Sequence, residues 1–185
     1  PLGAGWGIPM PMCYPEVQVD WPAKQHRLFY HATDHGGGAP GIPRRRIVER
    51  LEKEVRSEQL DIALYSSQQN RPTPEEYHAR MARALVGVSW NGAPNTDCNR
   101  YWENFAYGLA QVAEHPRIEI PDAPMDGVHC LYADSPDEVP PLVATLLAER
   151  ARATGMAERG HHHFRQYHSS VARARYFVDH LSRIT

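Results

Sequence analysis

The segments Leu60-Asp61-Ile62-Ala63-Leu64-Tyr65-Ser66, Thr73-Pro74-Glu75-Glu76 and Leu85-Val86-Gly87-Val88-Ser89-Trp90 decide the fold. The first and third segments are apolar runs with the length and composition of buried strands. The segment between them supplies an N-cap residue, a proline at the first helical position and two acids in the first turn, which predicts a helix to about Ala84. A strand, a helix and a strand in this order form a βαβ unit with parallel strands.

The same alternation continues on both sides of this unit. We expect further strands at residues 27–32, 109–113 and 128–132. Further helices are expected at residues 44–59, 97–107, from 135 onward, 151–167 and 169–184. Gly108 suits a helix end, and Ser135-Pro136-Asp137-Glu138 has the residues that open a helix. The pattern predicts an α/β fold, a three-layer α/β/α domain with a parallel sheet.

Residues 1–25 differ in composition from the rest of the chain. Five of the 16 prolines fall before Ala23. Because proline fixes its own φ and disfavours helix in the residue before it, we expect residues 1–25 to be an extended linker or the remnant of a preceding domain. Residues 26–185 are expected to form one domain. The chain starts at Pro1 without the features of a secretory signal, so we expect a fragment or a processed protein.

The composition is that of a globular protein without a membrane span. Of the 185 residues, 42% are hydrophobic and 23% are charged, and no apolar run approaches the length that a bilayer requires. The formal net charge is -2 and both signs are interspersed, so nucleic acid is not favoured as a partner. Cys13, Cys98 and Cys130 are odd in number and far apart, which favours a reducing, cytoplasmic location.

The segment Asn99-Arg100-Tyr101-Trp102-Glu103-Asn104-Phe105-Ala106-Tyr107-Gly108 carries the most information about function. Glu103 lies near a loop-to-helix junction that should face the carboxyl ends of the strands, where open parallel sheets bind ligands. Its carboxylate has acceptors for both hydroxyls of a vicinal diol such as ribose. The alternative is a solvated helix glutamate that pairs with Arg100, three residues earlier.

This segment, followed by an apolar strand, resembles the C-terminal domain of GT-B glycosyltransferases, in particular the spore-maturation-type branch. In that branch an Arg-aromatic-aromatic-Glu helix ends in Ala-x-Gly before a strand. The resemblance continues through residues 126–138, which look like the family's strand, aspartate and capped helix, and on to Gly160, His168 and Arg173. It covers most of residues 27–181 and implies a Rossmann-like domain, the C-terminal half of a GT-B fold.

The resemblance implies that residues 26–185 bind a nucleotide sugar whose sugar is transferred to an unknown acceptor. Glu103 matches the family's nucleotide-ribose glutamate, and we expect Thr96, Asn99 and Arg100 to contact the nucleotide sugar beside it. In this family the catalytic base and the acceptor site belong to an N-terminal domain. We therefore expect that missing N-terminal GT-B domain as a partner, and we assign no catalytic residue to this chain.

A glycine-rich loop, Asp34-His35-Gly36-Gly37-Gly38-Ala39-Pro40-Gly41-Ile42-Pro43, precedes Arg44-Arg45-Arg46. Glycines let backbone N–H groups approach a ligand, and arginines clamp phosphate oxygens. We therefore expect Gly37 and Arg45 to contact a diphosphate. The alternative is a surface loop with a solvated basic cluster, because the spacing is not Gly-x-Gly-x-x-Gly and three arginines oppose the helix dipole.

The loop Ser66-Ser67-Gln68-Gln69-Asn70-Arg71 follows the second strand and offers amide and hydroxyl groups. Ser67 is our candidate contact for the edge of the nucleobase, while a plain polar turn is the alternative. Together with the loops at 33–43, 91–96 and 115–126, this loop should surround one cleft at the carboxyl ends of the strands.

No metal site and no separate cofactor are expected. His161-His162-His163 point in different directions on a helix, so we expect solvated or cap-proximal histidines there, and a packing role for His168. The Asp-x-Asp, Gly-x-Ser-x-Gly and His-Glu-x-x-His patterns do not occur. The retaining branch of the resembling family has a second glutamate eight positions before the ribose glutamate, where this chain has Asn95, so the stereochemical outcome stays open.

Two other interpretations remain at this stage. One is a domain of the same fold that binds a nucleotide sugar or a partner without catalysis. The other is an unrelated flavodoxin-like domain, since a fold does not by itself decide a function.

Overall fold

The computed structural model describes residues 13–33, 41–65, 71–90, 98–116 and 118–183. Its centre is a five-stranded, fully parallel sheet with the strand order β2-β1-β3-β4-β5. The strands are β1 (Gln25–Thr33), β2 (Leu60–Tyr65), β3 (Ala84–Ser89), β4 (Ala110–Glu114) and β5 (Leu131–Ala133). The order of the strands reverses between β1 and β3, and open parallel sheets bind ligands at the carboxyl ends of the strands at such a switch point.

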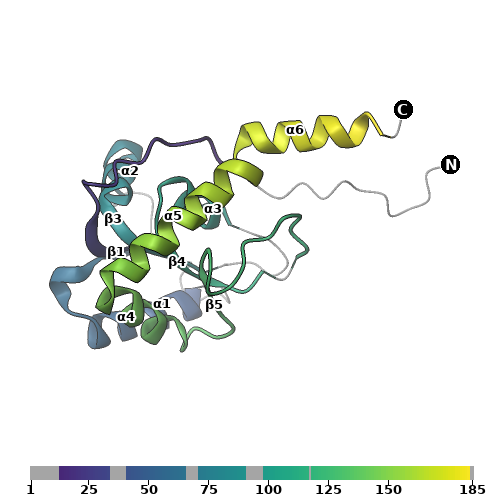
Figure 1. Cartoon of the computed structure of the whole chain (residues 1–185). Coiled ribbons are helices and arrows are strands. Elements are labelled where there is room, and N and C mark those ends of the chain that lie inside the picture. Colours follow the sequence, from purple (N-terminus) through teal and green to yellow (C-terminus); the bar gives the residue numbers. More distant parts are fainter. Residues whose placement is uncertain (1–12, 34–40, 66–70, 91–97, 117, 184–185) are drawn as a thin grey trace.

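Helices cover both faces of the sheet (Figure 1). They are α1 (Gly41–Glu54), α2 (Pro74–Arg83), α3 (Asn99–Ala106), α4 (Val139–Ala148), α5 (Arg150–Tyr167) and α6 (Ser170–Leu181). α1 and α4 pack together on one face, and α2 and α3 cover the other. The three-layer α/β/α architecture that the sequence pattern predicts is confirmed.

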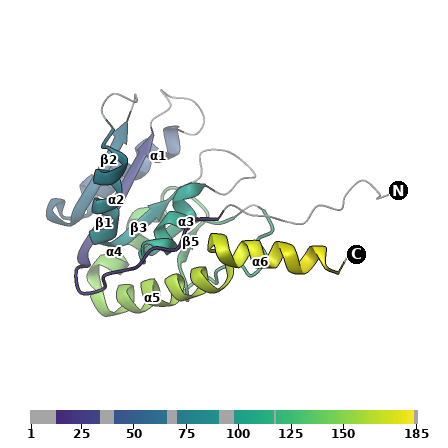
Figure 2. The same ribbon diagram turned by 90° about the horizontal axis from the view of Figure 1, so that it is seen from above.

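Of the three apolar clusters that hold the layers together among the described residues, two include residues of α5. The larger cluster joins the sheet to α1 and α4 and includes Leu51, Leu146 and, from α5, Met156. The second packs α3 against α5 through Trp102 and Phe164. α5 therefore passes from one face of the sheet to the other, and α6 continues beyond the body of the domain (Figure 2).

The predicted helix at 44–59 is divided in the structure. α1 ends at Glu54, and a short 3-10 helix, Ser57–Gln59, leads into β2. Val55 is still buried at the end of α1, which explains why the apolar periodicity continues past the last helical residue.

β5 and α4 both begin later than the sequence suggests. β5 starts at Leu131 and not at Val128, because the backbone N–H of Gly127 bonds the Cys130 carbonyl at 2.8 Å and closes a tight loop there. α4 starts at Val139. The Glu138 carboxylate accepts hydrogen bonds from the backbone N–H of Asp134 and the hydroxyl of Ser135, at 2.9 and 3.1 Å, and so holds the chain in a turn where a helix start is predicted.

Gly108 ends α3 as predicted. Its φ is +63°, in the left-handed region that glycine adopts without strain. A Cβ at this position would also lie 2.8 Å from the ring of Trp21. The glycine thus turns the chain from α3 into β4 and leaves room for the N-terminal segment.

Residues 13–24 lie along the domain and are attached to it by specific contacts. Tyr14 forms a bridge with Ser169, and the ring of Trp21 packs edge-on against His161 with a centroid distance of 5.9 Å. The buried Lys24 ammonium group donates to the carbonyls of Ala84 and Tyr107 at 2.8 and 2.5 Å. Burial lowers the pKa of Lys24 to about 7.

Candidate functional site

A cavity of about 300 Å³ lies at the carboxyl ends of β1 and β2, and we call it the strand-end cavity. Its walls come from the ends of both strands, the chain before and within α2, and the first half of α3. The side chains that line it include His31, Thr33, Tyr65, Arg71, Tyr77, Arg100 and Glu103. The cavity is therefore at the edge of the sheet where the fold predicts a ligand.

Glu103 lines the strand-end cavity from α3 and is held by Tyr77. The Tyr77 hydroxyl donates to Glu103 Oε2 at 3.1 Å and accepts from Arg100 Nε at 3.3 Å. Burial raises the pKa of Tyr77 to about 12, so its hydroxyl keeps the proton that it donates. Tyr77 thus stands between the two residues whose helical spacing suggested a direct pair. Within the described residues, Glu103 Oε1 has no hydrogen-bond partner.

The other predicted contact residues are only partly placed. Arg100 lines the cavity, whereas Asn99 is exposed at the start of α3 and Arg45 is exposed on the first turn of α1. Thr96, Ser67 and Gly37 lie outside the described residues.

Arg44, the neighbour of the predicted Arg45, reaches the switch point of the sheet. Its guanidinium donates to the carbonyl of Thr33 at the end of β1 at 3.1 Å and to the carbonyl of Trp90 after β3 at 3.4 Å. Its buried Nε has no hydrogen-bond partner among the described residues. Arg46, in contrast, pairs with Asp137 at 2.6 Å. Of the three arginines, Arg44 is placed to attract an anion at the strand ends.

Arg71 brings a second guanidinium to the end of β1. Its Nη2 donates to the Thr33 hydroxyl at 2.9 Å. Arginine presents several N–H donors in one plane, so the remaining donors of Arg44 and Arg71 suit phosphate oxygens.

His31 and Tyr65 are cavity residues that sequence reasoning missed. His31 is 1% exposed, and its Nε2 and Nδ1 atoms lie 2.8 Å from an oxygen of Asp61 and from the Tyr65 hydroxyl, respectively. Asp61 and Tyr65 are four residues apart in β2, so they share a face of the sheet with His31 of β1. A histidine within an apolar strand was the available signal.

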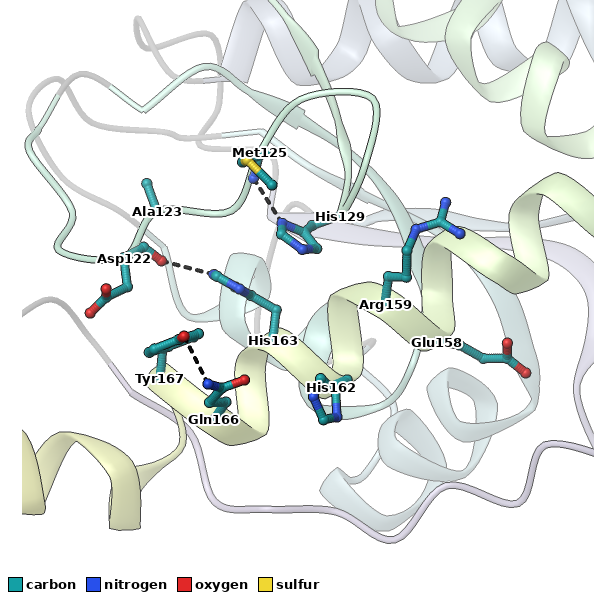
Figure 3. A pocket seen from close by; sticks show the side chains of 10 residues that line it. All are labelled: Asp122, Ala123, Met125, His129, Glu158, Arg159, His162, His163, Gln166 and Tyr167. Atoms are coloured by element: carbon teal, nitrogen blue, oxygen red, sulfur yellow. Dashed lines mark hydrogen bonds between the residues drawn. The ribbon is translucent and has the colours of Figure 1, made fainter.

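A second cavity of about 600 Å³ lies between α5 and the loop that precedes β5 (Figure 3), and we call it the α5 cavity. His129 and His163 stack in its wall with ring centroids 4.2 Å apart. His163 Nε2 donates to the Asp122 carbonyl at 2.8 Å, and His129 Nδ1 accepts from the backbone N–H of Met125 at 2.9 Å. Burial, then the neighbouring His163, lowers the pKa of His129 to about 4. These bonds hold the loop against α5.

The prediction of solvated or cap-proximal histidines at residues 161–163 is wrong for His161. His161 is buried and its Nδ1 lies 3.0 Å from the Phe105 carbonyl, while His163 contacts the loop described above. His162 is exposed. Their different directions are confirmed, as is the packing role of His168, whose ring is fully buried and stacks on Trp102 at 4.4 Å.

Among the described residues, no three His, Cys, Asp or Glu side chains are grouped so that they could hold a metal ion. In the same part of the chain, no helix combines the length and the apolar character needed to cross a membrane.

Comparison with known proteins gives a family for this arrangement of strands and helices. The sequence profile of the glycosyl transferase-like family matches residues 44–179, which include β2 to β5 and both α2 and α3. The chain belongs to this family. The profile does not decide between the branches of the family, so the resemblance to the spore-maturation branch stays a prediction. No curated protein sequence matches the chain.

The fold is also found in a solved glycosyltransferase domain. The C-terminal domain of a glycosyl transferase group 1 family protein, LpcC, from Francisella tularensis is similar with a TM-score of 0.55. The match covers 89% of this chain and 100% of that domain, at 8% sequence identity. At this identity the match shows the fold alone. The fold is thus Rossmann-like and that of the C-terminal domain of a GT-B glycosyltransferase.

Proposed function

We propose that this glycosyl transferase-like domain is the donor-binding half of a glycosyltransferase, and that the strand-end cavity binds the nucleoside diphosphate of a nucleotide sugar. The observation that carries the proposal is Glu103. Its carboxylate lies in a cavity at the ligand-binding edge of the sheet, with one oxygen held by Tyr77 and the other without a partner among the described residues. A carboxylate so fixed suits the two hydroxyls of a ribose.

Arginine side chains supply the complementary charge for the diphosphate. Arg44 and Arg71 both bond to Thr33 at the end of β1, beside the start of α1. Guanidinium groups and a helix N-terminus stabilise negative charge that develops on a leaving diphosphate. In this proposal the leaving group needs no metal cofactor.

The acceptor and a second domain belong to the same proposal. α6 projects from the domain (Figures 1 and 2) and carries exposed apolar side chains, namely Val171, Phe177, Val178 and Leu181. Exposed apolar stripes of this kind mark interaction surfaces. We propose that the N-terminal GT-B domain covers this stripe and supplies the acceptor site and the catalytic base.

A cytoplasmic location is the remaining part of the proposal. Cys13, Cys98 and Cys130 are all free thiols. Unpaired cysteines favour a reducing compartment.

The experiment is calorimetry of the 185-residue chain with UDP, GDP, CDP, ADP and dTDP at millimolar concentration. At least one of them should bind. Tyr77→Phe removes the hydroxyl that holds Glu103 and should weaken binding by about 0.5–1.5 kcal/mol, the typical worth of one hydrogen bond. Tyr167→Phe, in the α5 cavity, is the matched control and should leave the affinity unchanged. The absence of binding, or a loss in the control alone, would show that the strand-end cavity is not the donor site.

A further inference from the structure

Asp61 fixes the position of the proton on the His31 ring. The hydrogen bond with His31 is the largest cause of the lowered pKa of the Asp61 carboxyl, so Asp61 is ionised at neutral pH. An ionised carboxylate only accepts hydrogen bonds. The Nε2 atom of His31 therefore carries the proton, and in the neutral ring Nδ1 is left as an acceptor.

In this neutral tautomer the Tyr65 hydroxyl donates to His31. Its oxygen lies 2.8 Å from Nδ1, which in this tautomer has a lone pair and no hydrogen. Burial raises the pKa of Tyr65, so the hydroxyl keeps its proton for this bond. The proton of Tyr65 thus points to His31, and the lone pairs of its oxygen are left for the strand-end cavity.

The ring of His31 is also prevented from turning over. It stacks on Phe29 with a centroid distance of 4.5 Å and an interplanar angle of 17°, and Tyr77 packs edge-on against it at 6.3 Å. The side chain is 1% exposed. A flip would require these rings to separate, so the direction of the hydrogen bonds from Tyr65 to His31 to Asp61 is built into the packing.

We propose that Asp61 and His31 set the Tyr65 hydroxyl as a hydrogen-bond acceptor that reads an N–H group on the edge of the nucleobase. This inference rests on the proposed function, because it takes the ribose to be at Glu103. Tyr65 at the end of β2 and Glu103 on α3 line the same cavity, and the proposal places the base of a nucleoside at Tyr65 when its ribose is at Glu103. A base edge that offers only acceptors at this point meets the oxygen lone pairs and is rejected.

The first experiment compares two ligands on the 185-residue chain. Tyr65→Phe should raise the Kd of the tightest nucleoside diphosphate from the panel above by about three- to tenfold, the worth of one hydrogen bond. It should leave the Kd of ribose 5-diphosphate, which has no base, unchanged. Glu103→Gln should raise the Kd of both ligands. An equal loss for both ligands in Tyr65→Phe would place Tyr65 at the ribose and overturn the proposal.

The second experiment tests whether Asp61 acts through Tyr65. Asp61→Asn offers His31 both a donor and an acceptor, so the tautomer is no longer fixed. This variant should raise the Kd of the nucleoside diphosphate two- to fivefold in the natural chain and not at all in the Tyr65→Phe background. Arg80→Met is the control, because Arg80 also contacts Asp61, at 3.4 Å, but it does not line the cavity. Effects of Asp61→Asn and Tyr65→Phe that simply add would contradict the coupling.

The tautomer itself is measured by ¹⁵N nuclear magnetic resonance of the histidine rings. His31 should carry its proton on Nε2 in the natural chain and lose this preference in Asp61→Asn. A proton on Nδ1 in the natural chain would overturn the inference. These outcomes are separate from the proposed function, which fails if no nucleoside diphosphate binds in the strand-end cavity.

Discussion

His168 shows how one buried side chain makes the stability of the domain depend on pH. Its ring has no exposed surface, Nε2 donates to the Asp122 carbonyl at 2.7 Å, and Nδ1 accepts from Arg173. Burial, and then the charge of Arg173, lowers the pKa of His168 to about 3. The unfolded chain binds this proton near pH 6.5 and the folded chain does not, so stability falls as the pH falls from about 6.5 towards 3.

We predict that the titration of His168 alone lowers the free energy of unfolding by about 2 kcal/mol between pH 7 and pH 5. Urea unfolding at a series of pH values measures it. His168→Gln should reduce the slope of the free energy of unfolding against pH in this range. An unchanged slope would mean that His168 is not the group that titrates.

Some residues of the candidate site could be predicted from the sequence and others could not. The edge of the sheet that Glu103 faces could be predicted from its place in a helix after a strand end, and Glu103 does line the cavity there. Its contact with a ribose came from the family resemblance and stays a prediction. Arg45 was predicted as the phosphate contact and Arg44 was not, since adjacent residues near the start of a helix differ mainly in direction, and this direction depends on how α1 packs. The contact between His31 and Tyr65 was missed because it depends on the register of β1 and β2, which cannot be read from the sequence.

At the scale of elements, α5 offers a matched pair of glycines. A Cβ at Gly160 would clash with the His129 carbonyl at 2.8 Å and with the Phe105 ring at 2.9 Å. A backbone carbonyl and a packed aromatic ring cannot easily move aside. A Cβ at Gly155 would meet only the end of the Arg159 side chain, at 3.2 Å. Close packing of α5 on α3 and on the loop before β5 therefore depends on Gly160.

We predict that Gly160→Ala destabilises the domain by about 1–3 kcal/mol, the usual cost of overpacking. Gly155→Ala should instead stabilise it by about 0.5–1 kcal/mol, because alanine is the better helix former. Thermal or denaturant unfolding of the two variants measures both. Equal effects of the two changes would show that α5 is not packed as described.

The ends of helices were predicted correctly where hydrogen bonds between residues close in sequence determine them. The N-cap of α2 is Thr73, whose side chain accepts from the Glu76 backbone N–H at 3.2 Å in a complete capping box. The predicted start of α4 was wrong because the Glu138 carboxylate caps the preceding turn. The sequence allows either a helix start or a turn here, and packing decides between these two local hydrogen-bond patterns.

For the whole molecule, the alternation of strands and helices was sufficient to predict a parallel sheet with helices on both faces. The crossing of α5 from one face to the other was not predicted, because its apolar residues serve two clusters at once. The α5 cavity was also missed, because it depends on how the loop before β5 lies on that helix.

The half-enzyme proposal also makes a prediction about the whole molecule. The isolated chain should transfer no sugar, because the acceptor site and the base are proposed to lie on another domain, and positioning both substrates supplies much of the rate. A transfer assay with radiolabelled UDP-glucose, GDP-mannose and similar donors measures it. Turnover by the purified chain would contradict the division into two halves.

Calorimetry of Glu103→Gln beside Glu158→Gln tests whether Glu103 binds the ribose of a nucleoside diphosphate. Glutamine keeps an acceptor for Tyr77 but loses the charge, so nucleotide affinity should fall by about 1.5–3 kcal/mol, the typical worth of a hydrogen bond to a charged group, while the melting temperature changes little. Glu158 lines the α5 cavity, and its variant should bind as the natural chain does. Unchanged affinity in Glu103→Gln, with a clearly lowered melting temperature, would show that Glu103 is structural and would contradict the account.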